Sequence, residues 1–308
     1  MPNVSVGLPC YNGSRWLAES IESVLHQTYP DFELVIVDDG STDNSKKIIE
    51  RYLEDVRVRY LYQENKGFSG ATNRCIADSR GDYIAFMGQD DLWLPDKLER
   101  QVHKIEKGKY SLIHSDVYDI DSEGRIIGRR NLKVPKTQDR EAILARLLLS
   151  NFIAHPTVLV KRQCFDKVGL FDERMVIASD HDMWLRIAGE FDIGYISAPL
   201  IKKRLHEAQV SVKKPVECIK DEFLITEKAI TKYPFLKRYE SKKKARLYYF
   251  WGVILLRQHN LSEARNKAFK AIKEYPFDLI CYPLCISPSL WGSFLKKYFK
   301  SRNRPGWR

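Results

Sequence analysis

Short runs of apolar residues that stop abruptly at polar ones recur through about the first 210 residues of this chain of 308. The clearest run covers residues 83–87 and is followed closely by two adjacent carboxylates, Asp90 and Asp91. Apolar runs of this length bounded by polar residues are typical of buried strands. The two carboxylates would then lie just beyond the carboxyl end of a strand, where ligands bind in open α/β sheets.

Two adjacent carboxylates repel each other unless a cation lies beside them, and a divalent metal that carries a phosphate group suits such a pair. A solvated turn that happens to hold two Asp residues explains the pattern equally well. The same arrangement recurs upstream, however. The apolar run at residues 33–37 ends in Asp38 and Asp39, and the run at residues 4–8 also ends in a polar loop. Three predicted strands therefore bring polar loops to what should be one edge of a sheet.

Strands and helices are predicted to alternate along this part of the chain. Helices are expected near residues 17–25, 46–52, 70–79, 95–105 and 141–149 and from Asp180 onward, and further strands near residues 56–62, 111–118, 157–160, 192–196 and 200–205. Strands that alternate with helices imply an α/β fold with a mainly parallel sheet and right-handed crossovers.

Five short motifs follow one another in a characteristic order. They are the segment from Val4 to Asn12, the turn Val37-Asp38-Asp39-Gly40-Ser41, the pair Asn65-Lys66-Gly67 and Gly70-Ala71-Thr72-Asn73, the segment Gln89-Asp90-Asp91, and Asp180-His181-Asp182-Met183-Trp184-Leu185-Arg186. With this order and spacing, roughly residues 1–210 resemble the family-two inverting glycosyltransferases of the GT-A fold, of the bacterial cell-surface polysaccharide type. The resemblance implies a Rossmann-like catalytic domain over residues 1–212. Its nucleotide-sugar half would be about residues 1–95, and its acceptor half about 96–212.

The resemblance also implies where the reacting groups would lie. Asp180 stands at the position of the general base, which takes the proton of the acceptor hydroxyl. A divalent metal, Mn²⁺ or Mg²⁺, would be held by Asp90, Asp91 and His206 and would bind the diphosphate oxygens of the donor. The residues expected to contact the nucleoside-diphosphate sugar are Pro9, Tyr11, Asn12, Asp38, Asp39, Gly67, Gly70, Asn73, Gln89, Asp90 and Arg204.

Several of these positions also have plainer explanations. Asp180 at a helix start could be only an N-cap, and Arg204 with His206 could belong to a solvated edge strand. Trp184 could stack on an acceptor sugar or be an aromatic residue of the core. His155, which precedes a proline, matches a family pattern near the acceptor but could be an ordinary loop residue.

The chain departs from the family pattern at two positions. Many relatives have Asp where this chain has Gly88, so one carboxylate contact to the nucleotide is absent. Thr72 stands where an Arg often precedes the Asn that is here Asn73. One cationic contact to the donor is then missing. The Gly88 departure keeps a second function class open, a sugar-nucleotide-binding protein without turnover. Such a protein would bind a donor regardless of Asp180, whereas a transferase would need Asp180 for turnover.

Composition limits the other classes. With 44% hydrophobic and 30% charged residues, the chain is globular rather than disordered. The six cysteines lack a paired zinc spacing, and buried free thiols are expected. Residues 213–308 hold 22 Lys and Arg against 8 Asp and Glu, a net charge of +14. The charge of this basic region would suit a nucleic-acid-binding module. The region has neither stacking aromatics on a sheet nor a groove-reading motif, however, so no nucleic-acid partner is predicted.

The basic region is predicted to be helical. Tyr248, Gly252 and Ala264 belong to a pattern that resembles one tetratricopeptide-like hairpin. Residues 290–299 form an apolar stripe flanked by Lys and Arg, which suits a helix lying in a membrane interface. Packing against protein, including a second subunit, is the competing interpretation. Because the chain enters its first strand at once, we expect no signal peptide and therefore a cytoplasmic protein. The apolar stripe adds an expected peripheral contact with the inner face of the plasma membrane. The expected acceptor is a glycan or a lipid-linked molecule.

Overall fold

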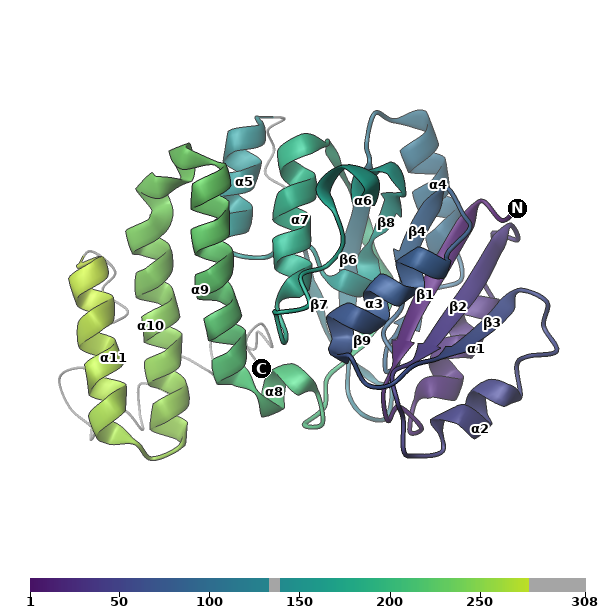
Figure 1. The fold of residues 1–308 in the computed structure, drawn as a ribbon, viewed down its shortest axis with the longest axis horizontal. Coiled ribbons are helices and arrows are strands. Elements are labelled where there is room, and N and C mark those ends of the chain that lie inside the picture. Colours follow the sequence, from purple (N-terminus) through teal and green to yellow (C-terminus); the bar gives the residue numbers. More distant parts are fainter. Residues whose placement is uncertain (133–138, 277–308) are drawn as a thin grey trace. The chain divides into compact units, whose positions relative to one another are not determined.

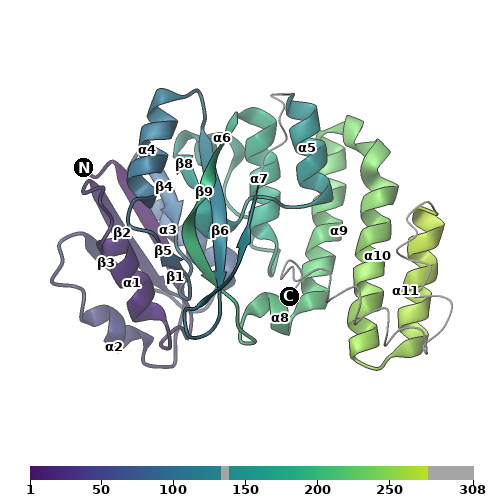
Figure 2. The same cartoon turned by 180° about the vertical axis from the view of Figure 1, so that it is seen from behind.

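The computed structural model describes residues 1–132 and 139–276, and internal packing divides the chain into two compact units, Met1–His206 and Glu207–Arg308. The first unit contains a nine-stranded sheet with helices on both faces (Figure 1 and Figure 2). The described part of the second unit is helical. The predicted α/β fold and the helical character of the C-terminal region are confirmed.

The carboxyl ends of most strands meet at one edge of the sheet. The strands are β1 (Val4–Cys10), β2 (Phe32–Asp38), β3 (Val58–Tyr62), β4 (Tyr83–Phe86), β5 (Leu92–Trp93), β6 (Leu112–Ile120), β7 (Ile126–Arg130), β8 (Leu159–Lys161) and β9 (Ile193–Arg204). Their order is β3-β2-β1-β4-β8-β6-β9-β5, and β7 pairs with β6. The first four strands are parallel, as are β6 and β9. Because β8 is antiparallel to both β4 and β6, strands β6 and β9 run in the same direction as β1.

The sheet is more mixed than the sequence predicts. Strands β5, β7 and β8 are antiparallel to their neighbours, and neither β5 nor β7 was expected. The two strands expected near residues 192–196 and 200–205 are one long strand, β9. The segment between them bulges against β6, where the register shifts around Asp116. A bulge absorbs extra residues without ending the strand, so Pro199 does not break it.

Helices cover both faces because the residues of each central strand alternate between two cores. The helices of this unit are α1 (Leu17–Leu25), α2 (Ser45–Glu50), α3 (Gly67–Asp78), α4 (Lys97–Lys107), α5 (Arg140–Leu149), α6 (Gln163–Val168) and α7 (Ser179–Glu190). On β2, Val35 and Val37 pack with α3, whereas Leu34 and Ile36 belong to the core that α1 and α4 complete on the other face. The strand period of two thus fixes which helices border the carboxyl edge from each side.

The described part of the second unit contains α8 (Val210–Lys213), α9 (Pro215–Lys232), α10 (Glu240–Arg257) and α11 (Leu261–Glu274). The predicted hairpin is formed by α10 and α11. The Asn260 side chain caps α11 by accepting a hydrogen bond from the Glu263 amide at 3.2 Å. A Cβ at Gly252 would lie 3.2 Å from the Ala264 carbonyl oxygen, so the small residue lets the helices approach. The apolar stripe at residues 290–299 lies outside the described residues.

Candidate active site

Four loops at the carboxyl edge are joined to one another. The Asp39 amide donates to the Cys10 carbonyl at 2.8 Å, which links the loops after β1 and β2. The Gln89 side chain accepts from the Tyr11 amide at 2.8 Å and donates to the Tyr11 carbonyl at 3.1 Å. The loop after β4 is in turn bonded to the end of β9, through Arg204. The polar loops that the sequence predicts at one edge therefore do meet there.

Asp90 and His206 form a pair across this edge. The His206 Nε2 atom lies 2.7 Å from Asp90 Oδ2, although the residues are 116 positions apart. The imidazole packs against the Trp16 ring, with 4.3 Å between ring centroids. Its Nδ1 atom is buried and has no hydrogen-bond partner within residues 1–132 and 139–276. A carboxylate oxygen and an imidazole nitrogen are thus held side by side beyond the ends of β4 and β9. Strand β9 lies between β6 and β5, so Arg204 and His206 do not belong to a solvated edge strand.

Asp91 is held in a buried position beside this pair. Its Oδ1 atom accepts a hydrogen bond from the Arg204 amide at 2.9 Å. Burial raises the pKa of Asp91 above that of an ordinary Asp, and the nearby Asp90 charge raises it further. A bound cation would act in the opposite direction and favour the ionised form. Placing the two carboxylates together therefore costs free energy, which a bound cation would reduce.

The Arg204 guanidinium fixes the loop that carries both carboxylates. It is 1% exposed, donates from Nε to the Asp90 carbonyl at 3.0 Å and pairs with Glu19 Oε2 at 2.8 Å. It also lies over the Trp16 ring, 5.3 Å from the centroid. The expected contact of Arg204 with the donor remains a prediction, and in this conformation the side chain positions Asp90. The sequence does not predict the roles of Glu19 and Trp16, because the residues around them give no indication of a contact with the distant Arg204.

The donor atoms fit a divalent metal that keeps open coordination positions. Asp90 and His206 offer an oxygen and a nitrogen, whereas the adjacent Asp91 has one oxygen engaged by the backbone. In the described ranges no three His, Cys, Asp or Glu side chains are arranged as a complete metal cage. Mn²⁺ and Mg²⁺ are commonly held by one or two protein ligands together with phosphate oxygens and water. Of the three predicted ligands, Asp90 and His206 thus form a close pair, and Asp91 is a buried carboxylate next to them.

Gly88 leaves space for the side chains of Asp90 and Asp91. A Cβ at this residue would lie 2.7 Å from Asp91 Oδ2 and 3.2 Å from Asp90 Oδ1. A side chain here would therefore require Asp91 to move. With the family's usual Asp at this position, Asp91 could not keep the position that it has here.

Asp38 and Asp39 shape the neighbouring loops. Asp39 is buried and accepts from the amides of Lys66 and Gly67, both at 2.8 Å. Gly67 has a φ of +77°, which favours glycine, and it begins α3. Asp38 accepts from the Ser41 amide at 2.8 Å. The predicted role of these carboxylates in donor binding is untested, and their visible role is to hold the loop before α3.

The other predicted donor residues fall into two groups. Pro9, Tyr11 and Asn12 lie at the end of β1, where the Asn12 side chain accepts from the Thr42 amide at 2.8 Å. Asn73 lies within α3 and ties it to the segment before α7, because its amide group donates to the Phe171 carbonyl at 3.0 Å and accepts from the Phe171 amide at 2.8 Å. At Gly70, also in α3, a Cβ would lie 2.6 Å from Lys66 Cβ.

Asp180 lies in the first turn of α7. The helix begins at Ser179 with Ala178 as its N-cap, so Asp180 is not the capping residue. The Ser69 hydroxyl near the start of α3 donates to the Ser179 hydroxyl at 2.9 Å. Gly67, which lies two residues before Ser69, donates its amide to Asp39 at the carboxyl edge of the sheet. Contacts through α3 therefore connect this edge with Ser179, the residue before Asp180.

Three further side chains of the acceptor half are structural. Asp182 is buried and pairs with Arg186 at 2.8 Å, so it holds that neighbouring side chain in place. Trp184 is fully buried, so the interpretation as an acceptor-stacking residue is wrong. His155 is not an ordinary loop residue either, because it is buried with its ring stacked on Phe86 at 4.6 Å between centroids. Burial lowers the pKa of His155 to about 3.

Replacing Trp184 with Ala should lower the free energy of unfolding by about 3–5 kcal/mol, because it leaves a cavity in a closed core. Trp184→Phe should cost less, since the indole Nε1 makes no hydrogen bond within the described residues. Urea unfolding followed by circular dichroism measures both values. An Ala variant with unchanged stability but impaired acceptor use would contradict the core assignment.

The comparisons with known proteins agree with this geometry. The model of glycosyl transferase family 2 matches residues 5–169, more than half of the chain. The chain therefore belongs to glycosyl transferase family 2. The match ends before Asp180 and His206, so those two positions rest on the fold and on the sequence resemblance.

Over the aligned residues, curated relatives are about a third identical to this chain. An uncharacterized glycosyltransferase of Rickettsia typhi is 32% identical over 68% of this chain and 66% of its own. An uncharacterized glycosyltransferase of Methanocaldococcus jannaschii is 31% identical over 82% of this chain and 85% of its own. The UDP-Glc:alpha-D-GlcNAc-diphosphoundecaprenol beta-1,3-glucosyltransferase WfgD of Escherichia coli is 32% identical over 68% and 80%. The chain spans about two thirds of the length of the Rickettsia typhi relative and 36% of a Rickettsia felis relative.

Solved structures confirm the GT-A fold. TarS 1–349 of S. aureus superimposes with a TM-score of 0.61 at 18% identity, covering 98% of this chain and 93% of its own. The mannosyltransferase PcManGT of Pyrobaculum calidifontis, solved with GDP-Man and Mn²⁺, superimposes with a TM-score of 0.62 at 17% identity. The superposition covers 97% of this chain and 82% of PcManGT. Among the helices described for the present chain, none has the length and hydrophobicity to cross a membrane.

Proposed function

We propose that this chain is a divalent-metal-dependent inverting glycosyltransferase. It would move a sugar from a nucleoside-diphosphate sugar to a hydroxyl group of a glycan or lipid-linked acceptor. The observation that carries the proposal is the Asp90–His206 pair, 2.7 Å apart at the carboxyl edge of the sheet, with the buried Asp91 beside it. Family membership supports glycosyl transfer in general. Two structural neighbours, TarS in complex with UDP-GlcNAc and PcManGT in complex with GDP-Man and Mn²⁺, bind donors and a metal of the proposed kinds.

The residues of the site divide the chemistry between them. Asp90 and His206 would hold a divalent metal, which as a Lewis acid neutralises the charge that develops on the leaving diphosphate. Arg204 and Glu19 keep the Asp90 loop in place through their 2.8 Å ion pair. Asp180 would accept the proton of the acceptor hydroxyl as that oxygen attacks the anomeric carbon. A single displacement from the face opposite the leaving group inverts the anomeric configuration.

The competing hypothesis, donor binding without turnover, rests on the departure at Gly88. The structure gives packing roles to Gly88 and to Thr72, the other residue that departs from the family pattern. Gly88 makes room for Asp91, and the Thr72 hydroxyl donates to the Phe68 carbonyl at 2.7 Å within α3. The family relatives are named as glycosyltransferases, which favours turnover.

A thermal-shift screen of nucleoside-diphosphate sugars tests the proposal. Each donor is added with Mn²⁺, with Mg²⁺ and with a chelator. A donor present at 100 times its dissociation constant should stabilise the protein by about 2.7 kcal/mol, and the shift should disappear in the chelator. No stabilisation by any donor with either metal would contradict the proposal.

We also propose that the C-terminal end, outside the described residues, attaches the protein to an anionic membrane surface on the cytoplasmic side. Each basic residue near such a surface contributes about 1 kcal/mol, so several acting together allow reversible binding. Deleting residues 288–308 should abolish sedimentation with anionic liposomes while activity on soluble acceptors remains. Unfolding of the shortened protein, or undiminished sedimentation, would favour packing of this segment against protein.

A further inference from the structure

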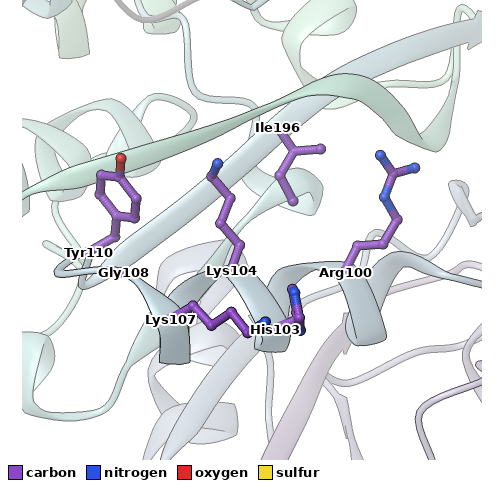
Figure 3. A pocket seen from close by; sticks show the side chains of 7 residues that line it. All are labelled: Arg100, His103, Lys104, Lys107, Gly108, Tyr110 and Ile196. Carbon is purple, nitrogen blue, oxygen red and sulfur yellow. The ribbon is translucent and has the colours of Figure 1, made fainter.

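A basic pocket lies at the opposite end of β6 and β9 from the candidate active site. It has a volume of about 440 Å³ and is lined by Arg100, His103, Lys104, Lys107, Gly108, Tyr110 and Ile196 (Figure 3). Ile196 pairs with Ser115 of β6, whereas Arg204 pairs with Ile120. Five residues of strand between Ser115 and Ile120 correspond to roughly 17 Å. A ligand in this pocket is therefore separate from any diphosphate held near Asp90.

The positive charge of the pocket comes from one face of α4. Arg100, His103, Lys104 and Lys107 are spaced three, four and seven residues apart, which places them on the same side of a helix. Figure 3 shows Arg100 and Lys104 extending in the same direction, toward the strand that carries Ile196. The helix macrodipole favours lysines near the C-terminal end of α4, but it does not account for Arg100 in the first turn.

These cations are largely uncompensated. Arg100 pairs with Asp96 at 3.3 Å, and both side chains are well exposed. In the parts of the chain that the structure describes, neither Lys104 nor Lys107 forms an ion pair with a carboxylate. Glu99, on the same helix, accepts from the Thr28 hydroxyl at 2.7 Å instead. The two lysines of the pocket wall therefore present donors that no carboxylate of the described residues pairs with.

The remaining lining is apolar. The Lys104 Nζ atom lies 5.7 Å from the centroid of the Tyr110 ring. Gly108 permits this packing, because a Cβ there would lie 2.7 Å from Tyr110 Cδ2. Ile196 is 9% exposed. Cationic side chains beside a small apolar surface are complementary to a phosphate group attached to a short carbon skeleton.

We propose that this pocket binds the phosphate group of a small phosphorylated organic ligand. Arg100, Lys104 and Lys107 contact the phosphate oxygens, and Tyr110 and Ile196 contact the adjoining carbon atoms. The same chemistry is offered by a free phosphate ester such as glycerol phosphate and by the glycerophosphate headgroup of an anionic phospholipid.

The test is a titration of the full chain with glycerol 3-phosphate by calorimetry, at constant ionic strength and with a chelator present. The chelator removes metal-dependent binding near Asp90, and repeating the titration with Asp90→Asn separates this site from the proposed function. In a second arm, the protein is sedimented with phosphatidylglycerol or phosphatidylcholine vesicles. Binding to glycerol 3-phosphate identifies a soluble ligand. Because the C-terminal end is also proposed to bind anionic vesicles, only the part of the phosphatidylglycerol binding that depends on Lys104 and Lys107 identifies a headgroup in this pocket.

The decisive variant is Lys104→Gln with Lys107→Gln. It should weaken whichever binding is observed by about tenfold or more, because each charge-assisted hydrogen bond is stronger than a neutral one. The matched control is Lys46→Gln with Lys47→Gln, which removes the same charge from the exposed surface of α2 and should leave binding unchanged. Equal weakening by both pairs, or no binding by the wild type in either arm, overturns the proposal. Circular dichroism establishes that both variants are folded.

Discussion

Asp90→Asn should reduce metal-dependent sugar transfer at least about 100-fold, a loss of roughly 2.7 kcal/mol of transition-state stabilisation. The substitution removes the negative charge that faces His206 Nε2 at 2.7 Å, while the amide oxygen can still accept a hydrogen bond. Donor binding should lose its dependence on Mn²⁺ or Mg²⁺, and the fold should persist because Arg204 bonds to the Asp90 backbone carbonyl. Calorimetric titration of the donor, with and without metal, measures this effect.

Asp82→Asn is the matched control. Asp82 is exposed and directly precedes β4, the strand whose other end leads to Asp90. The same chemical change at that end should leave metal-dependent donor binding intact. If the Asp90→Asn protein keeps the wild-type donor affinity with metal present, Asp90 is not the metal ligand.

Asp180→Asn should retain donor binding and lose most of the roughly 10²- to 10⁴-fold that a positioned general base contributes. The amide preserves the size of the side chain in the first turn of α7 but cannot take a proton. The Michaelis constant for the donor should therefore change little while the turnover number falls. Steady-state kinetics at saturating metal separates the two parameters.

Asp182→Asn, two residues along the same helix, gives the contrast. Asp182 is buried and pairs with Arg186, which donates in turn to the Val168 carbonyl at 2.6 Å. Its replacement should lower stability more than turnover. Turnover by the Asp180→Asn protein at the wild-type rate would rule out the general-base role, and donor binding with no turnover in the wild type would favour the binding-protein hypothesis.

The residues that could be predicted from sequence are those whose role is local. The apolar runs at residues 4–8, 33–37 and 83–87 correspond to β1, β2 and β4, because burial on both faces leaves a continuous hydrophobic signature. The parallel arrangement of these strands then brings their polar loops together. Asp90 follows directly from this reasoning.

The contacts that could not be predicted join distant positions. The Glu19–Arg204 ion pair links residues 185 positions apart, and neither α1 nor β9 records the other in its local pattern. Strand β7 has an exposed face, so its sequence lacks the apolar run that marks the central strands. The antiparallel direction of β8 follows from how the chain returns to the sheet, which hydrophobic spacing does not encode.

Trp184 illustrates a different limit. Its neighbours in the sequence, Asp180 to Arg186, resemble a functional motif, and an aromatic residue there could serve an acceptor or the core equally well. The helical period places Trp184 one turn beyond Asp180, but only the packing of Phe171 and His155 against its ring shows that it is enclosed.

The central claim is that Asp180 and the Asp90–His206 pair catalyse one direct displacement at the anomeric carbon. The most direct measurement is ¹H NMR of the glycoside formed from the donor that the thermal-shift screen identifies. The coupling between H1 and H2 of the transferred sugar reports its anomeric configuration. The account predicts a configuration opposite to that of the donor, and a product that retains the donor's configuration would contradict it.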